Sequence, residues 1–286
     1  MESRAANLFS VSPSPLQILE RLPAELRARR LVTLATTPAE RPVIVGGASP
    51  LSGTASMGPP AEPLVGGARS VLPLGLEGVD ALLPGGGLLR GGVVELMVRG
   101  GGALGTTLAL GACRAVQREG QGWCGFVDPS GTLHAPGVAG LGVELERLLV
   151  VRPPLEMLSR VVLRMAEARV FSLLVVDTAG VADLALDVHL GPWVRVVRRL
   201  ALALQGTEST VLLLTSRSAP RPLALPVSQR LELERRSERE LSLAVTKDPQ
   251  GRLAPPRQLA VQQLRGVRRT GPGLSSSRPR RMAGAA

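Results

Sequence analysis

Between residues 71 and 247, short stretches that are apolar throughout alternate with stretches of helical periodicity, and this alternation constrains the fold more than any other feature. Strands buried on both faces lose the polar–apolar alternation of half-exposed strands, and they are typical of parallel sheets covered by helices. The pattern therefore predicts an α/β domain with a doubly wound, mostly parallel sheet. The expected strands are 91–98, 122–128, 146–153, 171–180 and 209–217, and the expected helices are 106–118, 154–170 and 193–207.

The flanking stretches predict appendages to this core. Two alternating stretches, 230–236 and 240–248, indicate an antiparallel hairpin at the sheet edge. Leucines at helical spacing predict an N-terminal helix over 15–35 that Pro23 kinks or splits. A strand-like "RPVIV" at 41–45 interrupts a region rich in Pro, Gly, Ser and Ala. The expected organisation is an N-terminal helical segment (1–36), a linker with a short strand (37–70), a core (71–262) and a disordered basic tail (263–286).

The stretch "RGGGALGTTLAL", residues 99–110, joins the first expected strand to the first expected helix of the core. Gly100 and Gly105 have the spacing of a phosphate-binding P-loop, and Thr107 stands where that loop holds magnesium through a hydroxyl. Asp177 ends another expected strand, where a carboxylate completes the metal shell in such sites. These residues predict a nucleotide site at the carboxyl ends of the strands.

The same turn departs from a working P-loop at one position. Thr106 stands where the loop has its lysine, and Lys247 is the only lysine of the chain, so no neighbouring lysine replaces it. A tight turn between a strand and a helix also uses glycine for purely steric reasons, and this interpretation stays open. The sequence therefore predicts a degenerate P-loop that requires no cofactor and leaves weak ATP–magnesium binding, through Thr107 and Asp177, open.

Several stretches in order resemble the bacterial RecA recombinase family. Residues 72–97 are similar to the segment that leads into that family's P-loop, and 112–128 to its next helix and strand. "FSLLVVDTAG" at 171–180 resembles the strand with the magnesium carboxylate, and 187–204 the helix after the first DNA-binding loop. The resemblance covers residues 71–247 and implies a RecA-like core preceded by a short helix and a linker.

The departures from the family imply that ATPase chemistry is lost. Ser130 occupies the place of the family's catalytic glutamate, and a serine is no general base for water at neutral pH. Thr215 and Ser216, at the family's polar sensor, are followed by a shorter, proline-rich stretch in place of the long second DNA loop. The chain is thus expected to have no catalytic residues and to be no enzyme.

Among RecA-related groups, the resemblance is nearest to the ImuA family, also labelled SulA-like. These are accessory proteins of damage-induced translesion synthesis in the SOS response. It implies a non-catalytic role in DNA repair, with a RecA-type recombinase or an ImuB-like polymerase partner. An active RecA-type, DNA-dependent ATPase and a cell-division inhibitor are the alternatives. Residues 1–50 are expected to mediate contact with the recombinase or with another copy of the chain.

The formal net charge of +11 favours contact with polyanions such as nucleic acid. Aromatic residues are 2% of the chain, too few for a base-stacking platform, so DNA contact is expected to be directed at phosphates and sensitive to salt. Much of it is expected in the tail. The tail's candidate arginines are Arg265, Arg268, Arg269, Arg278, Arg280 and Arg281.

Two cysteines in apolar surroundings and two histidines make neither a disulfide framework nor a zinc site. No signal peptide or membrane span is expected, and a reducing cytoplasm is the expected compartment.

Overall fold

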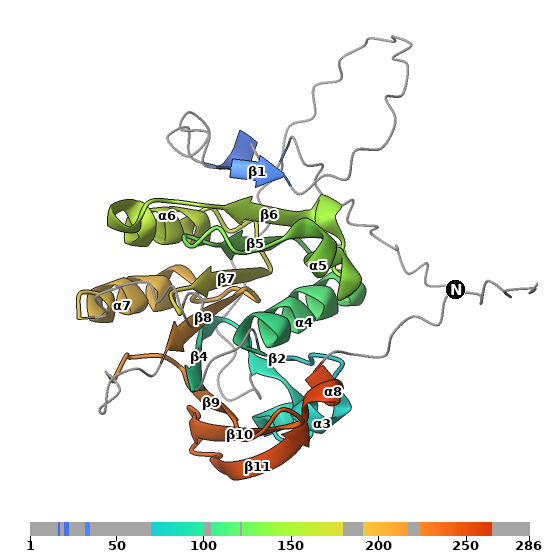
Figure 1. The fold of residues 1–286 in the computed structure, drawn as a ribbon. Helices are drawn as coiled ribbons and strands as arrows, with labels where there is room; N and C mark the ends of the chain where they lie inside the picture. Colours follow the sequence, from blue (N-terminus) through green and yellow to red (C-terminus); the bar gives the residue numbers. More distant parts are fainter. Residues whose placement is uncertain are drawn as a thin grey trace, which may run out of the picture.

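The computed structural model describes residues 17, 20–22, 32–34, 70–99, 104–120, 122–179, 191–216 and 224–264 (Figure 1). Its main sheet has nine strands in the order β1-β6-β5-β7-β8-β4-β9-β10-β11. Six adjacent strands run parallel. They are β6 (Leu148–Val151), β5 (Cys124–Val127), β7 (Leu173–Asp177), β8 (Thr210–Ser216), β4 (Gly92–Arg99) and β9 (Gln229–Arg235). The uniformly apolar stretches predicted five of them, whereas β9 was predicted only as part of an antiparallel hairpin, and its parallel pairing with β4 was not expected.

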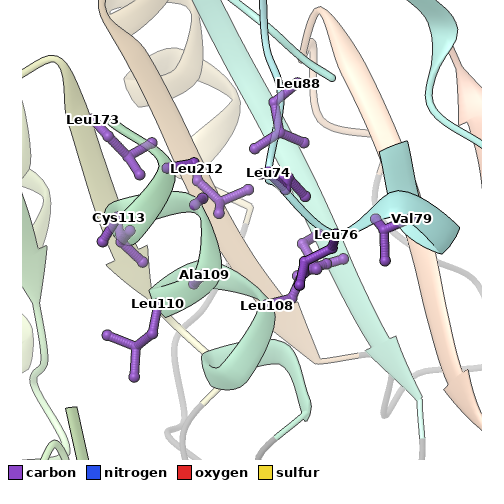
Figure 2. Packing of buried hydrophobic residues seen from close by; sticks show 14 of the residues in the cluster. Leu74, Leu76, Val79, Leu88, Leu108, Ala109, Leu110, Cys113, Leu173 and Leu212 are labelled. Atoms are coloured by element: carbon purple, nitrogen blue, oxygen red, sulfur yellow. The ribbon is translucent and has the colours of Figure 1, made fainter. Parts of the chain in front are cut away.

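Helices cover both faces of this sheet, so the predicted doubly wound α/β class is confirmed (Figure 1). On one face, Leu108 and Ala109 of α4 belong to an apolar cluster with Leu173 of β7 and Leu212 of β8 (Figure 2). Val94 and Leu96 of β4 belong to the same cluster. On the other face, α6 and α7 pack on Val93 and the alternate residues of β7 and β8. The helices are α3 (Glu77–Asp80), α4 (Leu104–Glu119), α5 (Ala135–Gly140), α6 (Leu155–Glu167), α7 (Trp193–Ala203) and α8 (Val261–Leu264), with 3-10 turns at Pro84–Gly86 and Leu145–Arg147.

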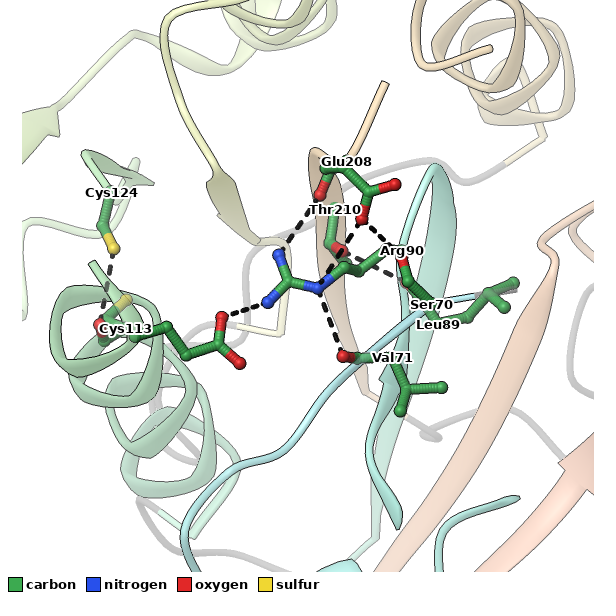
Figure 3. Close-up of polar contacts among 9 residues, drawn as sticks. Ser70, Val71, Leu89, Arg90, Cys113, Cys124, Glu208 and Thr210 are labelled. Atoms are coloured by element: carbon green, nitrogen blue, oxygen red, sulfur yellow. Dashed lines mark hydrogen bonds and ion pairs between the residues drawn. The ribbon is translucent and has the colours of Figure 1, made fainter. Parts of the chain in front are cut away.

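The segment before β4 forms a small two-stranded sheet, β2 (Val71–Leu72) with β3 (Leu88–Leu89), that the sequence did not predict. Arg90, directly after β3, fixes this sheet to the rest of the domain (Figure 3). Its guanidinium donates to the Val71 carbonyl at 3.2 Å, to the Glu208 carbonyl at 3.4 Å and to the Glu119 carboxylate at the end of α4. One cation thus joins three elements at the amino ends of the central strands.

The N-terminal region differs from the expected helix over 15–35. Residues 17, 20 and 21 are helical, but Val32–Leu34 form a strand, β1, which pairs antiparallel with β6. Helix prediction to residue 35 was therefore wrong, because β-branched residues at 32 and 33 favour a strand where a sheet edge is available for pairing. Leu22 is buried in the apolar cluster that also contains the inner residues of α6 and α7. The strand-like stretch at 41–45 lies outside the described residues.

The C-terminal part of the sheet is antiparallel. The predicted hairpin is confirmed as β9 and β10 (Glu240–Lys247), but a third strand, β11 (Ala254–Ala260), pairs with β10 and forms the edge. Helix α8 then continues to Leu264, whose side chain is buried. The tail was predicted to begin at residue 263, but residues 263 and 264 belong to α8, and Leu264 is part of the core around α4. Residues 265–286 lie outside the described residues.

Candidate functional site

The predicted nucleotide site lies where β4, β8 and β7 end at the same edge of the sheet. Strand β8 separates the other two, pairing with β4 through Leu214↔Leu96 and with β7 through Leu214↔Asp177. Thr106 and Thr107 occupy the first turn of α4, which follows β4 and packs across β7. The fold therefore brings Thr106, Thr107 and Asp177 to one edge of the sheet, whereas Gly100 lies outside the described residues.

Gly105 has a packing role that accounts for the glycine by itself. It is buried in the first turn of α4, and a Cβ at this position would lie 2.6 Å from Cγ2 of Val98 on β4. Any larger residue would therefore require the Val98 side chain or the helix to shift. The steric explanation of this glycine, left open by the sequence, is thus supported by the close approach of α4 to β4.

The first turn of α4 supplies backbone donors but no cation from position 106. N–H groups at the start of a helix have no intrahelical acceptor and favour anions. Thr106 and Thr107 are half-buried here, each with a neutral hydroxyl. In a P-loop, a lysine ammonium neutralises the outer phosphates of the nucleotide. Thr106 has no charge, so the first turn of α4 is poorly suited to nucleotide hydrolysis.

Asp177 is buried at the last position of β7, where its Oδ1 accepts a hydrogen bond of 3.0 Å from the Ala179 N–H. The next residue, Thr178, is held to β8, because its hydroxyl donates to the Leu214 carbonyl at 2.6 Å. The carboxylate therefore stabilises the turn that leaves β7. Among the described residues, no three His, Cys, Asp or Glu side chains form a group that could hold a metal ion.

Ser130 lies in the loop after β5 and is engaged with the buried carboxylate of Asp128. Its hydroxyl donates to Oδ1 of Asp128 at 3.0 Å and lies 3.0 Å from the Thr132 hydroxyl. The same carboxylate accepts the Thr132 and Leu133 N–H groups at 3.2 and 2.9 Å, and Arg152 lies 3.4 Å away. Ser130 thus belongs to the hydrogen bonds that shape this loop.

A buried ionic network beside the site was not predicted from the sequence. Glu95, in the middle of β4, accepts a hydrogen bond of 2.7 Å from Nε of Arg230 on β9 and one of 3.0 Å from the Thr215 hydroxyl on β8. Arg230 also donates to the Leu225 carbonyl at 3.2 Å. The glutamate side chain is 2% exposed. The only available signal was an acidic residue within an otherwise apolar strand, and its partners lie more than 100 residues away.

A cation further along α4 does not replace the missing lysine. Arg114 donates through Nη1 to the Leu141 carbonyl at 3.3 Å, so its guanidinium lies against the loop after α5, two turns from Thr107. Burial, and then the charge of Arg118, lower the pKa of this arginine. The tail arginines predicted to bind DNA lie outside the described residues.

Comparison with known proteins defines the class of this fold. The solved structure of the RadB recombinase matches with a TM-score of 0.53 and 19% sequence identity, over 68% of this chain and 97% of that chain. The chain therefore has a RecA-like fold, with two further strands, β10 and β11, that continue the sheet antiparallel beyond β9. At this identity the match establishes the fold alone.

At the level of sequence families, residues 81–221 match the model described as the MT3502 N-terminal domain. This region runs from the end of α3 past β8 and includes the turn between β4 and α4 as well as Asp177. A comparison with curated proteins gives no match. Within the described residues, every helix is too short or too polar to span a bilayer.

Proposed function

We propose that this chain is a non-catalytic RecA-like accessory protein of DNA repair that acts through contacts with other proteins. The observation that carries the proposal is Thr106 in the first turn of α4, at the lysine position of a P-loop. Its hydroxyl brings no charge to stabilise the transition state of phosphoryl transfer. The RecA-like fold and the RadB recombinase match support a role related to recombination or repair.

The second support is the place of Ser130. Hydrolysis also needs a group that orients or deprotonates the attacking water. Ser130 holds the loop after β5 through Asp128 and has no basic group of its own. Loss of the cation and of the base removes two separate contributions to catalysis, while weak nucleotide binding at the α4 turn remains compatible with the proposal.

The specific role we propose is that of the ImuA type, in damage-induced translesion synthesis in the cytoplasm. The partners would be a RecA-type recombinase or an inactive, ImuB-like polymerase homologue. The resemblance over residues 71–247 is the basis for this assignment.

The proposal is tested first by phosphate release with and without single-stranded DNA. We expect no turnover above background, and none from Thr106→Lys, because water activation is still missing. Thr106→Lys/Ser130→Glu is the matched variant that restores both groups. DNA-stimulated phosphate release by the unaltered protein that disappears with Asp177→Ala would contradict the proposal.

The partner is tested by affinity capture from DNA-damaged cells, with undamaged cells as the control. Recovery of a recombinase or a mutagenesis polymerase supports the accessory role. Capture of the division-ring protein in their place would support the cell-division alternative instead.

A further inference from the structure

A groove with arginine-rich walls lies between α6 and α7, on the helix layer across the sheet from α4. It encloses about 320 Å³ and is lined by Ser159, Arg160, Leu163, Arg164, Glu167 and Arg199. Glu167 bridges the two helices at one end of the groove, since it lies 3.2 Å from Arg164 on its own helix and 3.2 Å from Arg199 on α7. One carboxylate therefore fixes two guanidinium groups that remain 47% and 63% exposed.

The surface around the groove is strongly basic. Every charged residue of α7 is an arginine, and all three are exposed. On α6 and the turn that follows it, exposed arginines again outnumber exposed glutamates. The exposed charged residues of this layer are Arg160, Arg164, Arg169, Arg195, Arg198 and Arg199 against Glu156 and Glu167.

The arginines are arranged in two rows, one on each helix. Arg160 and Arg164 are four residues apart on α6, and Arg195 and Arg199 are four residues apart on α7. Residues at this spacing lie on the same face of a helix, where like charges destabilise it slightly. Glu167 joins Arg199 to α6, and Arg195 lies one helical turn before Arg199 on the exposed face of α7, outside the six residues that line the groove. Arg160, Arg164 and Arg199 in the groove, with Arg195 one turn beyond it, thus form a track of cations along the two helices.

We propose that the α6–α7 groove binds the phosphodiester backbone of nucleic acid. Guanidinium groups pair with phosphate oxygens through fixed, forked donors. A track of cations matches a backbone that carries one charge per 3.4 Å of each strand. The exposed groove residues include no aromatic side chain, so contact is made to phosphates and not to base faces. This site goes beyond the proposed function, which concerns protein partners and the α4 turn.

The test measures binding of fluorescein-labelled 30-nucleotide oligo(dT), and of a duplex of the same length, to the full chain over a series of salt concentrations. The groove variant is Arg160→Gln/Arg195→Gln, which leaves the Glu167 ion pairs in place. The control is Arg118→Gln/Arg257→Gln, which removes the same charge from exposed residues on α4 and β11. Circular dichroism melting verifies that both variants fold.

Each phosphate contact contributes about 0.7 to 0.9 to the slope of log affinity against log salt. We therefore expect the groove variant to bind at least about tenfold more weakly at 0.1 M salt, with a slope reduced by about 1 to 2. The control variant is expected to lose less than about threefold, through the general field alone. Comparing the two probes shows whether single strands or duplexes fit the groove better.

The proposal is overturned if the groove variant binds like the unaltered protein, if both variants weaken binding equally, or if the unaltered protein binds neither probe at low salt.

A labelled polyglutamate peptide is the last probe. Groove-dependent binding of this peptide without binding of DNA would assign the groove to an acidic protein segment. Deletion of residues from Gly266 onward, in the unaltered protein and in the groove variant, distinguishes DNA binding by the tail from binding by the groove. If the two sites are independent, their losses of binding free energy add. None of these outcomes depends on the partner of the proposed function.

Discussion

Glu95 is a buried, charged residue in a strand whose other buried side chains are apolar. It is the one acidic residue of β4, and its carboxylate is held by Arg230 and Thr215 from the two flanking strands. Removing one partner of such a buried pair leaves an uncompensated charge, which is costly, whereas replacing both partners often is not. The network therefore fixes the register of three strands at the cost of desolvating two charges.

Arg230→Met is expected to lower the free energy of unfolding by about 3–5 kcal/mol, because the buried Glu95 carboxylate loses its counter-ion. Urea unfolding followed by circular dichroism measures this change. The double variant Glu95→Gln/Arg230→Met is expected to recover much of the loss. Equal destabilisation by the single and double variants would show that the arginine acts through packing and not through charge.

At the residue scale, the sequence predicted where the candidate site residues lie in the fold, but not which neighbouring residues they contact. The places of Thr106, Thr107 and Asp177 follow from strand ends and helix starts, which periodicity predicts well. The engagement of Ser130 with Asp128 could not be predicted, since it depends on the path of the loop after β5. The close contact between Gly105 and Val98 likewise depends on how near α4 lies to β4.

The turn between β10 and β11 is organised by a single carboxylate. Asp248 is buried and accepts hydrogen bonds from the Gln250 N–H at 2.9 Å and from Nε of Arg252 at 3.1 Å. Burial alone raises the pKa of this carboxyl, but the hydrogen bonds from Arg252 and the backbone outweigh it, and the pKa lies below its ordinary value.

Because the pKa of Asp248 is lower in the folded state, the unfolded state binds more protons in acid. Its contribution to stability is therefore complete above the unfolded pKa of about 3.9 and is lost as the pH falls through the folded pKa. Asp248→Asn is expected to reduce stability at pH 6 and to flatten the decline of the urea midpoint below about pH 4. Glu238→Gln, in the exposed β9–β10 turn, is the control. An unchanged acid profile for Asp248→Asn would refute this role.

At the element scale, uniformly apolar strands and amphipathic helices were predicted from 91 to 217, with ends that differ by a few residues. Strand β11 was missed because two prolines interrupt its pattern, and they are tolerated here because β11 forms the edge of the sheet. Strand β1 was missed because its pairing with β6 is supplied by distant sequence, and a three-residue stretch has little periodicity of its own.

For the whole molecule, the N-terminal segment is the part that we predict to connect one chain to another. In the structure, β1 pairs with β6 of its own chain and Leu22 lies in the core, which favours folding back over contact in trans. The segment between β1 and β2 is long enough for the same pairing to form with a second molecule. Contact in trans therefore stays a prediction.

A chain that starts at Val71 is expected to remain folded, with a lower melting temperature, because it loses Leu22 from the core and leaves the edge of β6 open. It is also expected to lose binding to a RecA-type recombinase and to the full chain, measured by pull-down and light scattering. Leu22→Ala in the full chain is the control for stability alone. Undiminished binding by the shortened chain would place the interface on the core.

The central position of β4 has a consequence for synthesis on the ribosome. Val94 pairs with Leu212 on one side and Gln229 on the other, so both neighbours of β4 emerge about 120 residues or more after it. At about 5–20 residues per second, this apolar strand stays unpaired on both edges for roughly 6–24 s or longer. Nascent chains with such exposed edges aggregate readily. The yield of folded protein in cells should therefore depend on chaperones that bind the nascent chain during this interval.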